Sequence, residues 1–517
     1  MIPAGTPISM KHRKQQQDES TFLHHFLPYC KRVGAESPVN KIGYLTICVR
    51  MLLCLGLVNM VSLQTQAASA SPNIVLIMAD DLGWSDVGFN GNSVVQTPQL
   101  DAMASNGLVF DRFYAAAPVC SPTRGSCLTG RHPYRYGIPT ANAGHMLPEE
   151  VTLAEILKEQ GYATGHFGKW HLGTLTREGK DSNRGGHQNQ QHFAPPTEHG
   201  FDTYFSTEAK VPTWDSQWAP PKHNRKWWDP VEPSHRASYG TSYWTPEGRV
   251  EKALDGDDSK VIMDRALEFV EGQVEAEQPF FTVVWFHAPH LPVVSGKRWT
   301  DLYATLGGYH RNYYGCISAL DHQVGRLRAK LDELGVKKDT MLWFCADNGP
   351  EGQSFSAPGS AWPLSGRKRS LREGGIRVPG ILEWPAMVRG GQRTDLPAVT
   401  SDYLPTIVEM LDASLPDRPI DGMSLIPLIA GKSNERLKAI ESRTLGFQSA
   451  KQFAWMHGSL KYYSPDKGET DFLFDINSDI SESNNLAEQR PDVLRSMKRA
   501  FLEWRQSCVE SANGEDY

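Results

Sequence analysis

Three features that often identify a protein class are missing from this chain of 517 residues. Its 8 cysteines form no Cys-x-x-Cys pair, so the sequence indicates neither a zinc site nor a dense disulfide framework. Acidic residues outnumber basic ones, 59 to 53, and the net charge of −6 argues against a nucleic-acid binder. There is no internal repeat and no heptad run. The hydrophobic content of 40% is sufficient for one large domain and a smaller one.

The first seventy residues differ in character from the rest. Residues 1–40 are polar and without pattern, whereas 42–63 are apolar and interrupted by Arg50. Ala68-Ser-Ala70 fits a small-x-small cleavage site, so we predict a signal peptide within 1–70. The mature protein is then exported, to the periplasm or the extracellular space. The alternative is a signal anchor in a membrane, which the charge of Arg50 disfavours.

Short apolar runs alternate with helical patterns along the mature chain. The runs at 74–78, 280–286 and 340–346 are unbroken, as expected for strands that are buried on both faces of a parallel sheet. Helical patterns at 153–160 and 313–334 are each followed by a glycine. This alternation predicts an α/β fold in which helices sandwich a large, mainly parallel sheet.

Residues 174–250 depart from this alternation. They are rich in Gly, His, Asn and Pro, and they include five tryptophans: Trp214, Trp218, Trp227, Trp228 and Trp244. So long a region without a clear period is typical of a functional surface loop. Its tryptophans either offer stacking surfaces to sugar rings or pack the loop itself.

The C-terminal part has a third pattern, in which short strands precede an amphipathic helix. The strands are expected at 453–456, 460–463 and 471–475, and the helix at 492–504. We therefore expect a catalytic domain at 71–432 and a small α+β subdomain at 433–517.

Two oxygen-rich pairs directly follow predicted strands. Asp80-Asp81 comes after the first strand, and Asp347-Asn348 comes after the third. Either pair alone is more often a turn or a helix cap. Ligands of such folds gather at the carboxyl ends of strands, so the two pairs can share one site. Their side chains offer only oxygen ligands, which predicts Ca²⁺ or Mg²⁺ rather than Zn²⁺.

Lysine and histidine side chains occur in three further motifs. They are Lys169, His171, His287, His290 and Lys368. Lys169 and His171 are two residues apart, which puts both on one face of an extended segment. His287-Ala-Pro-His290 directly follows the second predicted strand, and Lys368 lies on a glycine-containing loop. A single histidine of this kind is more often a structural imidazole with its hydrogen bonds made, and a single lysine is more often a solvated charge. Only the combination of these residues indicates a functional site.

The last motif is Cys120-Ser-Pro-Thr-Arg124, with Leu-Thr-Gly at 128–130. A free cysteine is often only a small buried hydrophobe. The pattern Cys-x-Pro-x-Arg, however, resembles the modification signature of the type I, formylglycine-dependent sulfatases of the alkaline phosphatase superfamily. In that family a dedicated enzyme oxidises the cysteine to formylglycine. Together, the motifs resemble this family across nearly the whole mature chain and in the expected order.

Two longer stretches add to the resemblance. Residues 362–377 are similar to the arylsulfatase B group, the N-acetylgalactosamine-4-sulfatases, and 473–487 resemble the family's C-terminal hairpin. The resemblance implies an alkaline phosphatase-like fold and a sulfuric ester hydrolase of the arylsulfatase type. Because the groups of the family share this core and differ in substrate, the motifs identify the catalytic machinery. The insertion at 177–191 departs from the compact loop of the family.

The resemblance also implies the residues that hold the nucleophile, the metal and the sulfate. Cys120 becomes formylglycine, whose hydrate supplies the nucleophile and binds Ca²⁺, with Mg²⁺ as the alternative. The remaining metal ligands are Asp80, Asp81, Asp347 and Asn348. Lys169 and Lys368 hold sulfate oxygens, and Arg124 holds the nucleophile and metal side of the pocket.

Acid–base roles and partners follow from the same resemblance. His287 protonates or assists the departing alcohol, and His171 takes the proton from the second hydroxyl so that the aldehyde reforms and sulfate leaves. His290 is a weaker candidate, in a supporting role. The implied partners are a sulfated carbohydrate or aryl sulfate substrate and a formylglycine-generating or sulfatase-maturating enzyme.

Two other functions remain open from the sequence. A phosphomonoester or phosphonate hydrolase of the same superfamily is the first, because sulfate and phosphate esters have similar shapes. A Cys signature in place of a Ser or Thr nucleophile favours the sulfatase over it. The second is a non-catalytic binding protein on the same scaffold, and the presence of all the expected polar residues argues against it.

Overall fold

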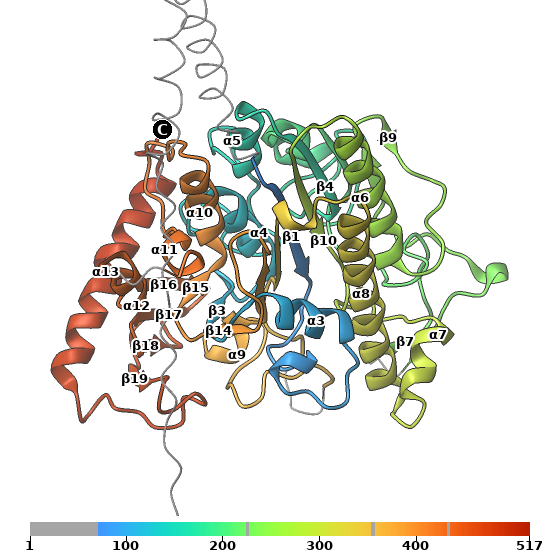
Figure 1. The fold of residues 1–517 in the computed structure, drawn as a ribbon. Coiled ribbons are helices and arrows are strands. Elements are labelled where there is room, and N and C mark those ends of the chain that lie inside the picture. Colours follow the sequence, from blue (N-terminus) through green and yellow to red (C-terminus); the bar gives the residue numbers. More distant parts are fainter. Residues whose placement is uncertain (1–70, 224–226, 353–356, 432–434) are drawn as a thin grey trace, which may run out of the picture. The chain divides into compact units, whose positions relative to one another are not determined.

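The computed structural model describes residues 71–517 apart from 224–226, 353–356 and 432–434 (Figure 1). The predicted targeting segment 1–70 lies outside the described residues. Among the helices that are described, none is both long enough and apolar enough to cross a membrane.

A sheet of ten strands forms the centre of the described chain (Figure 1). In spatial order its strands are β14 (Gln392–Thr394), β2 (Leu108–Phe110), β13 (Gly380–Glu383), β11 (Thr340–Ala346), β1 (Asn73–Ala79), β10 (Phe280–Trp285), β4 (Ala163–Lys169), β5 (Thr203–Thr207), β8 (Tyr243–Thr245) and β9 (Gly248–Arg249). The strands from β11 to β5 run parallel, whereas β13, β8 and β9 are antiparallel to their neighbours.

The place of β1 in the sheet explains its unbroken apolar sequence. It lies between β11 and β10, with Val75 opposite Leu342 and Thr282. The residues from Ile74 to Ala79 are at most 2% exposed. A central strand that is covered on both faces must be apolar on both sides. The three strands predicted as buried are confirmed as β1, β10 and β11.

Helices cover the sheet in two groups, which Figure 1 shows on different sides of it. In one group α3 and α6 both pack on α8, and α6 contacts β4 and β10; in the other α5 and α10 pack on α4. The bounds are α3 (Pro98–Asn106), α4 (Cys120–Thr129), α5 (Leu153–Glu159), α6 (Asp258–Glu275), α8 (Gly308–Glu333) and α10 (Tyr403–Met410). The α/β fold with a mainly parallel sheet is confirmed. Of the two predicted helices, α5 has nearly the predicted bounds, and α8 begins earlier, at Gly308.

Shorter elements connect these layers. The helices are α7 (Lys297–Thr300), α9 (Glu373–Ile376), α11 (Ile426–Ile429) and α12 (Glu435–Glu441). The strands are β3 (Phe113–Tyr114), β12 (Arg377–Val378) and β15 (Ala398–Val399), which pair with one another, and the pair β6 (Lys222–His223) and β7 (Trp227–Trp228).

The interpretation of 174–250 as a surface loop is wrong in part. β5 lies in the main sheet beside β4, and β8 and β9 extend the same edge. Four consecutive residues of β5, from Tyr204 to Thr207, are at most 5% exposed. β5 was not predicted because it is short and lies in a stretch of turn-forming residues. Trp228 is buried, and two further tryptophans are half-buried: Trp214 lies against Gly296, and Trp244 Nε1 donates to Asp181 Oδ2 at 2.7 Å.

The C-terminal residues form a separate antiparallel sheet of four described strands. They are β16 (Thr444–Ser449), β17 (Gln452–His457), β18 (Leu460–Ser464) and β19 (Phe472–Asp475). Helix α13 (Pro491–Ala512) packs on this sheet through buried Met497 and Phe501. The predicted strands and helix are confirmed; β16 was not predicted, and α13 continues past the predicted end because Cys508 prolongs its buried face.

Candidate active site

Carboxylates collect where two neighbouring parallel strands end. β1 runs into Asp80 and Asp81, and β11 runs into Asp347 and Asn348. The Asp81 amide donates to Asp347 Oδ1 at 3.1 Å, and Asn348 Nδ2 donates to Asp81 Oδ1 at 2.7 Å. All four residues are 0% exposed. The structure therefore brings the two predicted pairs into one buried cluster.

The free oxygens of this cluster fit a hard cation. Asp80 Oδ1, Asp81 Oδ2 and Asn348 Oδ1 are buried and accept no hydrogen bond within the part of the chain that the structure describes. Burying such oxygens without a donor is costly unless a cation compensates them. Carboxylate and amide oxygens are preferred ligands of Ca²⁺, and carboxylates also suit Mg²⁺. The residues present fit a divalent cation of this class.

Two lysines contact the carboxylates from different elements. Lys169 is the last residue of β4, and its Nζ lies 2.6 Å from Asp80 Oδ2. Lys368 comes from the loop before α9, and its Nζ lies 2.6 Å from Asp81 Oδ1. Both lysines are buried. Two ammonium groups thus converge on the same strand ends, where an anion would meet positive charge.

The Arg124 side chain contacts the carboxylate cluster and the end of β4. Its Nη2 lies 2.7 Å from Asp347 Oδ2 and 3.6 Å from Asp80 Oδ2, and its Nη1 donates to the Lys169 carbonyl at 3.1 Å. The guanidinium also lies 5.2 Å from the centre of the Trp285 ring, within cation–π range. Arg124 therefore fixes the strand ends relative to α4.

Burial and neighbouring charges shift the pKa values of the clustered carboxylates in opposite directions. Burial raises the pKa of Asp80, but the charges of Lys169, His290 and Arg124 outweigh burial and hold that pKa well below its usual value. Burial and the neighbouring Asp80 raise the pKa of Asp347 to about 7. Carboxylates this close ionise together only when enough positive charge is present.

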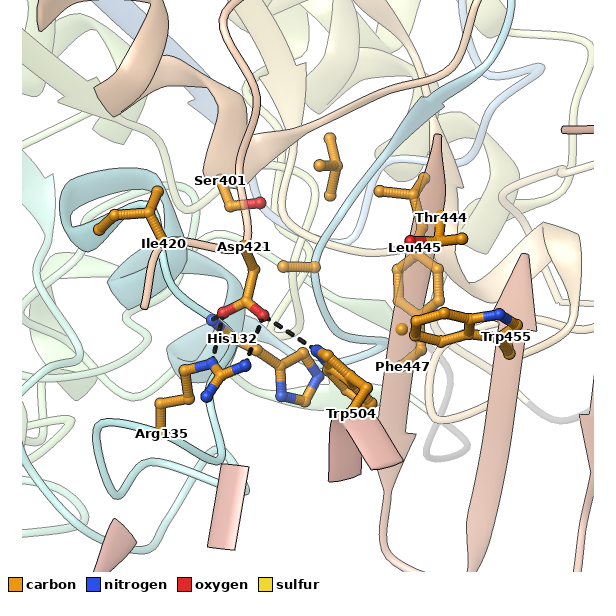
Figure 2. Close-up of a pocket in the computed structure, with 13 residues that line it drawn as sticks. His132, Arg135, Ser401, Ile420, Asp421, Thr444, Leu445, Phe447, Trp455 and Trp504 are labelled. Atoms are coloured by element: carbon orange, nitrogen blue, oxygen red, sulfur yellow. Dashed lines mark hydrogen bonds and ion pairs between the residues drawn. The ribbon is translucent and has the colours of Figure 1, made fainter. Parts of the chain in front are cut away.

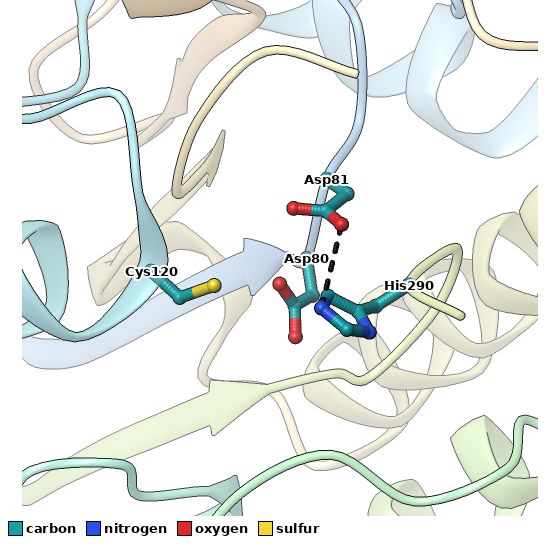
Figure 3. Close-up of side chains that lie close together, drawn as sticks. All are labelled: Asp80, Asp81, Cys120 and His290. Atoms are coloured by element: carbon teal, nitrogen blue, oxygen red, sulfur yellow. Dashed lines mark ion pairs between the residues drawn. The ribbon is translucent and has the colours of Figure 1, made fainter. Parts of the chain in front are cut away.

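Cys120 lies beside this cluster as the first residue of α4 and is 2% exposed. Its sulfur and ligand atoms of Asp80, Asp81 and His290 all lie within 4.8 Å of one another (Figure 3). Burial raises the pKa of the Cys120 thiol to about 12. The unmodified thiol is therefore protonated at neutral pH and is a poor nucleophile.

His171 approaches the cluster through an unusual backbone turn. It has φ of +58°, and nearby Gly168 has φ of +103°, where a Cβ atom would lie 2.0 Å from the Trp285 carbonyl. Burial, together with the charge of Lys169, holds the pKa of His171 well below its usual value. The ring is therefore neutral, and its Nε2 lies 3.2 Å from Nδ2 of Asn183.

The other two histidines follow β10. His287 is 0% exposed, and its Nε2 lies 2.8 Å from Thr207 Oγ1. Thr207 ends β5 and is the register partner of Lys169, so His287 lies beside the same strand ends as the lysines. His290 Nε2 lies 3.5 Å from Asp81 Oδ2. His290, the weaker candidate from the sequence, thus belongs to the cluster itself.

All the side chains predicted for the site gather at the carboxyl ends of the central strands. They are Asp80, Asp81, Cys120, Arg124, Lys169, His171, His287, Asp347, Asn348 and Lys368. Sequence reasoning missed Asn183, Thr207 and Asp258, which contact the histidines. Asn183 lies in the insertion at 177–191, whose departure from a compact loop was the available signal.

The arginines around Lys368 have structural partners. Arg367 donates to the carbonyl oxygens of Gly359, Glu351 and Pro358, and Arg369 forms two hydrogen bonds to the Glu351 carboxylate. They therefore shape the loop that carries Lys368.

A cavity of about 280 Å³ lies away from this cluster, next to the C-terminal sheet (Figure 2). Its walls include Phe447, Trp455 and Trp504. The Asp421 carboxylate in this cavity already accepts hydrogen bonds from Arg135 and Trp504. The charged groups of this cavity are paired with each other. Unlike the strand ends, the cavity therefore does not bring free carboxylate oxygens, lysines and a cysteine together.

Comparison with known proteins agrees with this geometry. The family model described as Sulfatase matches residues 72–413. The N-acetylgalactosamine-6-sulfatase of Mus musculus is 32% identical over 436 residues, covering 79% of this chain and 77% of that protein. Arylsulfatase A of Bos taurus is 32% identical over 486 residues, covering 84% of this chain and 88% of that protein.

Solved structures extend the comparison. Ps i-CgsB in complex with k-i-k-neocarrahexaose has a TM-score of 0.70 and 26% sequence identity, covering 84% of this chain and 92% of that one. The phosphonate monoester hydrolase of Agrobacterium radiobacter has a TM-score of 0.61 at 19% identity, which shows a shared fold alone. The family model, the curated relatives and the fold agree that this chain belongs to the sulfatase family, whose members are sulfuric ester hydrolases.

Proposed function

We propose that this protein hydrolyses sulfate monoesters of carbohydrates through a formylglycine made from Cys120, with one bound Ca²⁺ and Mg²⁺ as the alternative ion. The observation that carries the proposal is the meeting of Cys120 with a buried carboxylate cluster whose free oxygens fit a hard cation. Lys169 and Lys368 supply the positive charge that a sulfate group requires at the same place.

The metal ligands in this proposal are Asp80, Asp81, Asp347, Asn348 and the modified Cys120. When bound, the cation withdraws charge from the reacting oxygens, and formylglycine supplies a hydrated aldehyde as nucleophile.

The protein's own side chains orient the ester and move protons. Lys169 and Lys368 bind sulfate oxygens in a buried site, where fixed charges act strongly. Arg124 holds Asp347 and α4 in place. His287 gives a proton to the departing alcohol, and neutral His171 removes a proton so that sulfate can leave. His290 supports Asp81.

The names of relatives and the chemistry of the site support a proposal for the substrate class. Two of the relatives compared above are named for N-acetylgalactosamine 6-sulfate and for aryl sulfates, and Ps i-CgsB was solved with a carbohydrate. We propose a sulfated carbohydrate as the natural substrate and an aryl sulfate as a surrogate. The similarity of 362–377 to N-acetylgalactosamine-4-sulfatases makes the 4-sulfate ester the second candidate beside the 6-sulfate ester.

Two cellular requirements complete the proposal. A formylglycine-generating or sulfatase-maturating enzyme must oxidise Cys120. Residues 1–70 direct export, with cleavage near Ala70 and a signal anchor as the alternative.

Sulfate release tests the function directly. The protein should be produced in a host that modifies Cys-x-Pro-x-Arg sites and incubated with 4-nitrophenyl sulfate and with N-acetylgalactosamine 4- and 6-sulfate. We expect turnover of the aryl ester and of at least one sugar ester, and a loss of several orders of magnitude in Cys120→Ser. Near-full activity of that variant would contradict the mechanism.

The same assay also tests the alternative function, a phosphomonoester or phosphonate hydrolase. The fold is shared with a phosphonate monoester hydrolase, so phosphate and phosphonate esters belong in the substrate panel. Faster hydrolysis of those esters than of the matched sulfates would favour the phosphohydrolase function.

A further inference from the structure

His287 is held from two sides by buried side chains that no sequence motif indicated. Its Nε2 lies 2.8 Å from Thr207 Oγ1, and its Nδ1 lies 2.8 Å from Asp258 Oδ2. Asp258 Oδ1 accepts a hydrogen bond from the Tyr243 hydroxyl at 2.7 Å. Each of these four residues is at most 1% exposed. The ring therefore has a fixed orientation and a carboxylate partner on the side away from Thr207.

The hydrogen bonds fix the protons of this group. Thr207 has one hydroxyl proton, which it donates to the Ala209 carbonyl at 2.6 Å. His287 Nε2 must then donate to Thr207 Oγ1, because no other proton is available for that contact. An ionised carboxylate only accepts hydrogen bonds, so Nδ1 donates to Asp258. An imidazole that donates from both nitrogens is a positively charged imidazolium.

Asp258 lies where the backbone of a helix favours negative charge. It is the first residue of α6, an 18-residue helix, where unpaired backbone amides give the helix end a partial positive charge. The titratable groups packed around the pair are Tyr243 on β8, Asp257 at the same helix end and Cys316 on α8. Tyr243 is a hydrogen-bond donor to the carboxylate and so also stabilises its charge.

The pair of His287 and Asp258 lies close to the carboxylate cluster of the proposed active site. Thr207 is the register partner of Lys169 across β4 and β5, and Lys169 contacts Asp80 in the carboxylate cluster. The Nε2 proton, which Thr207 accepts, therefore lies at the end of β5 beside the strand that carries Lys169, whereas the Nδ1 proton is directed toward α6.

We propose that Asp258 is a positioning residue that keeps His287 as an imidazolium, so that its Nε2 proton is available to the departing alcohol. This inference rests on the proposed sulfatase function. As a bond forms between sulfur and the attacking oxygen of the nucleophile, the bond between sulfur and the alcohol oxygen breaks, and its electron pair stays on the alcohol oxygen. The Nε2–H group exchanges its contact with Thr207 for one with the alcohol oxygen; the Nε2–H bond then breaks, and its proton passes to that oxygen. Neutral His287 keeps its Nδ1–H bond, which still donates to Asp258, and a hydronium ion of the solvent later returns a proton to Nε2 and leaves water.

A leaving-group comparison tests this role. A sugar alcohol must be protonated as it leaves, whereas 4-nitrophenolate is a stable anion that leaves without a proton. Asp258→Asn should therefore lower kcat for the sugar sulfate by about 10²- to 10⁴-fold, the usual contribution of a general acid. It should lower kcat for 4-nitrophenyl sulfate much less.

A matched control is available at the same helix end. Asp257 caps α6 by accepting a hydrogen bond from the Lys260 amide at 3.1 Å, and no described contact joins it to His287. Asp257→Asn keeps a good capping residue and removes a neighbouring charge. It should leave the ratio of sugar to aryl turnover unchanged. Asp258→Ser removes the same charge with another residue suited to a helix start, and it should repeat the selective loss if Asp258→Asn does not fold.

The outcomes separate this inference from the proposed function. A wild-type protein that carries formylglycine but cleaves neither ester would overturn the function and the inference with it. An active wild type whose Asp258 variants lose both esters equally, or keep both, would overturn the role of Asp258 alone. Loss of sugar-sulfate turnover with much smaller loss of 4-nitrophenyl sulfate turnover, in the Asp258 variants and not in Asp257→Asn, is the expected result.

Discussion

Lys461 should be among the most sensitive positions for stability, although it lies far along the chain from the site residues. It is a lysine on β18 with 0% exposure, and its Nζ lies 2.8 Å from Glu373 Oε1 and 3.0 Å from Glu482 Oε1. Glu482 also accepts hydrogen bonds from the Glu373 amide at 2.7 Å and from Ser365 Oγ at 2.8 Å. These contacts fasten the segment that carries Lys368 to the C-terminal sheet.

Lys461→Met removes the ammonium and leaves two buried carboxylates next to each other. Breaking a buried pair in this way costs about 3–5 kcal/mol of unfolding free energy. Burial raises the pKa of Glu373, but the charges of Lys461 and Arg377 outweigh burial and lower that pKa from its ordinary value of 4.5. A lowered carboxyl pKa contributes stability above the unfolded value and loses it as the pH falls. The deficit of the variant should therefore be full at pH 7 and shrink on acidification below 4.5.

Urea unfolding followed by tryptophan fluorescence measures this deficit at both pH values. Lys498→Met is the matched control, because Lys498 pairs with Asp471 at 2.7 Å but is 31% exposed, and such a pair contributes about 1 kcal/mol or less. If Lys461→Met loses no more stability than Lys498→Met, or if its deficit does not change with pH, the reasoning is refuted.

Three further predictions concern the metal, the N-terminus and the reaction. Elemental analysis of active protein should find about one Ca²⁺ or Mg²⁺ per chain, and chelation should abolish turnover; stoichiometric zinc with neither of these ions would contradict the oxygen-ligand argument. Sequencing of secreted protein should give a terminus near Ser71, and an intact terminus upstream of residue 42 in the cytoplasm would contradict export. kcat/KM should be higher for an aryl sulfate than for the matching aryl phosphate, because sulfate is the better leaving group in the second step; the reverse order would count against the sulfatase mechanism.

Part of the site was predictable from the sequence, because residues that follow neighbouring parallel strands lie close together. Asp80 and Asp347 directly follow apolar runs, and neighbouring parallel strands bring their carboxyl ends together. Lys368 was predictable only through family resemblance, since nothing local in a glycine-containing loop shows that its Nζ reaches Asp81.

Other features were hidden because a local pattern does not reveal a partner distant in the chain. Asp258 follows Asp257 at the start of a helix, where acidic residues are common for local reasons. Lys461 lies between Leu460 and Tyr462 in β18, and so it resembles an ordinary solvent-facing lysine. Only the fold shows that Asp258 meets His287 and that Lys461 meets two glutamates. β5 was missed because its few apolar residues lie within a long stretch of loop-like composition.

The central claim is that Cys120 is converted to the catalytic group, and the mass of the peptide that contains it tests this most directly. The peptide should be analysed from preparations made with and without a formylglycine-generating enzyme, alongside turnover of 4-nitrophenyl sulfate. We predict that turnover rises in proportion to the fraction of peptide with the mass of the aldehyde and vanishes when all of it carries cysteine. Full turnover from protein that carries only unmodified cysteine would contradict the account.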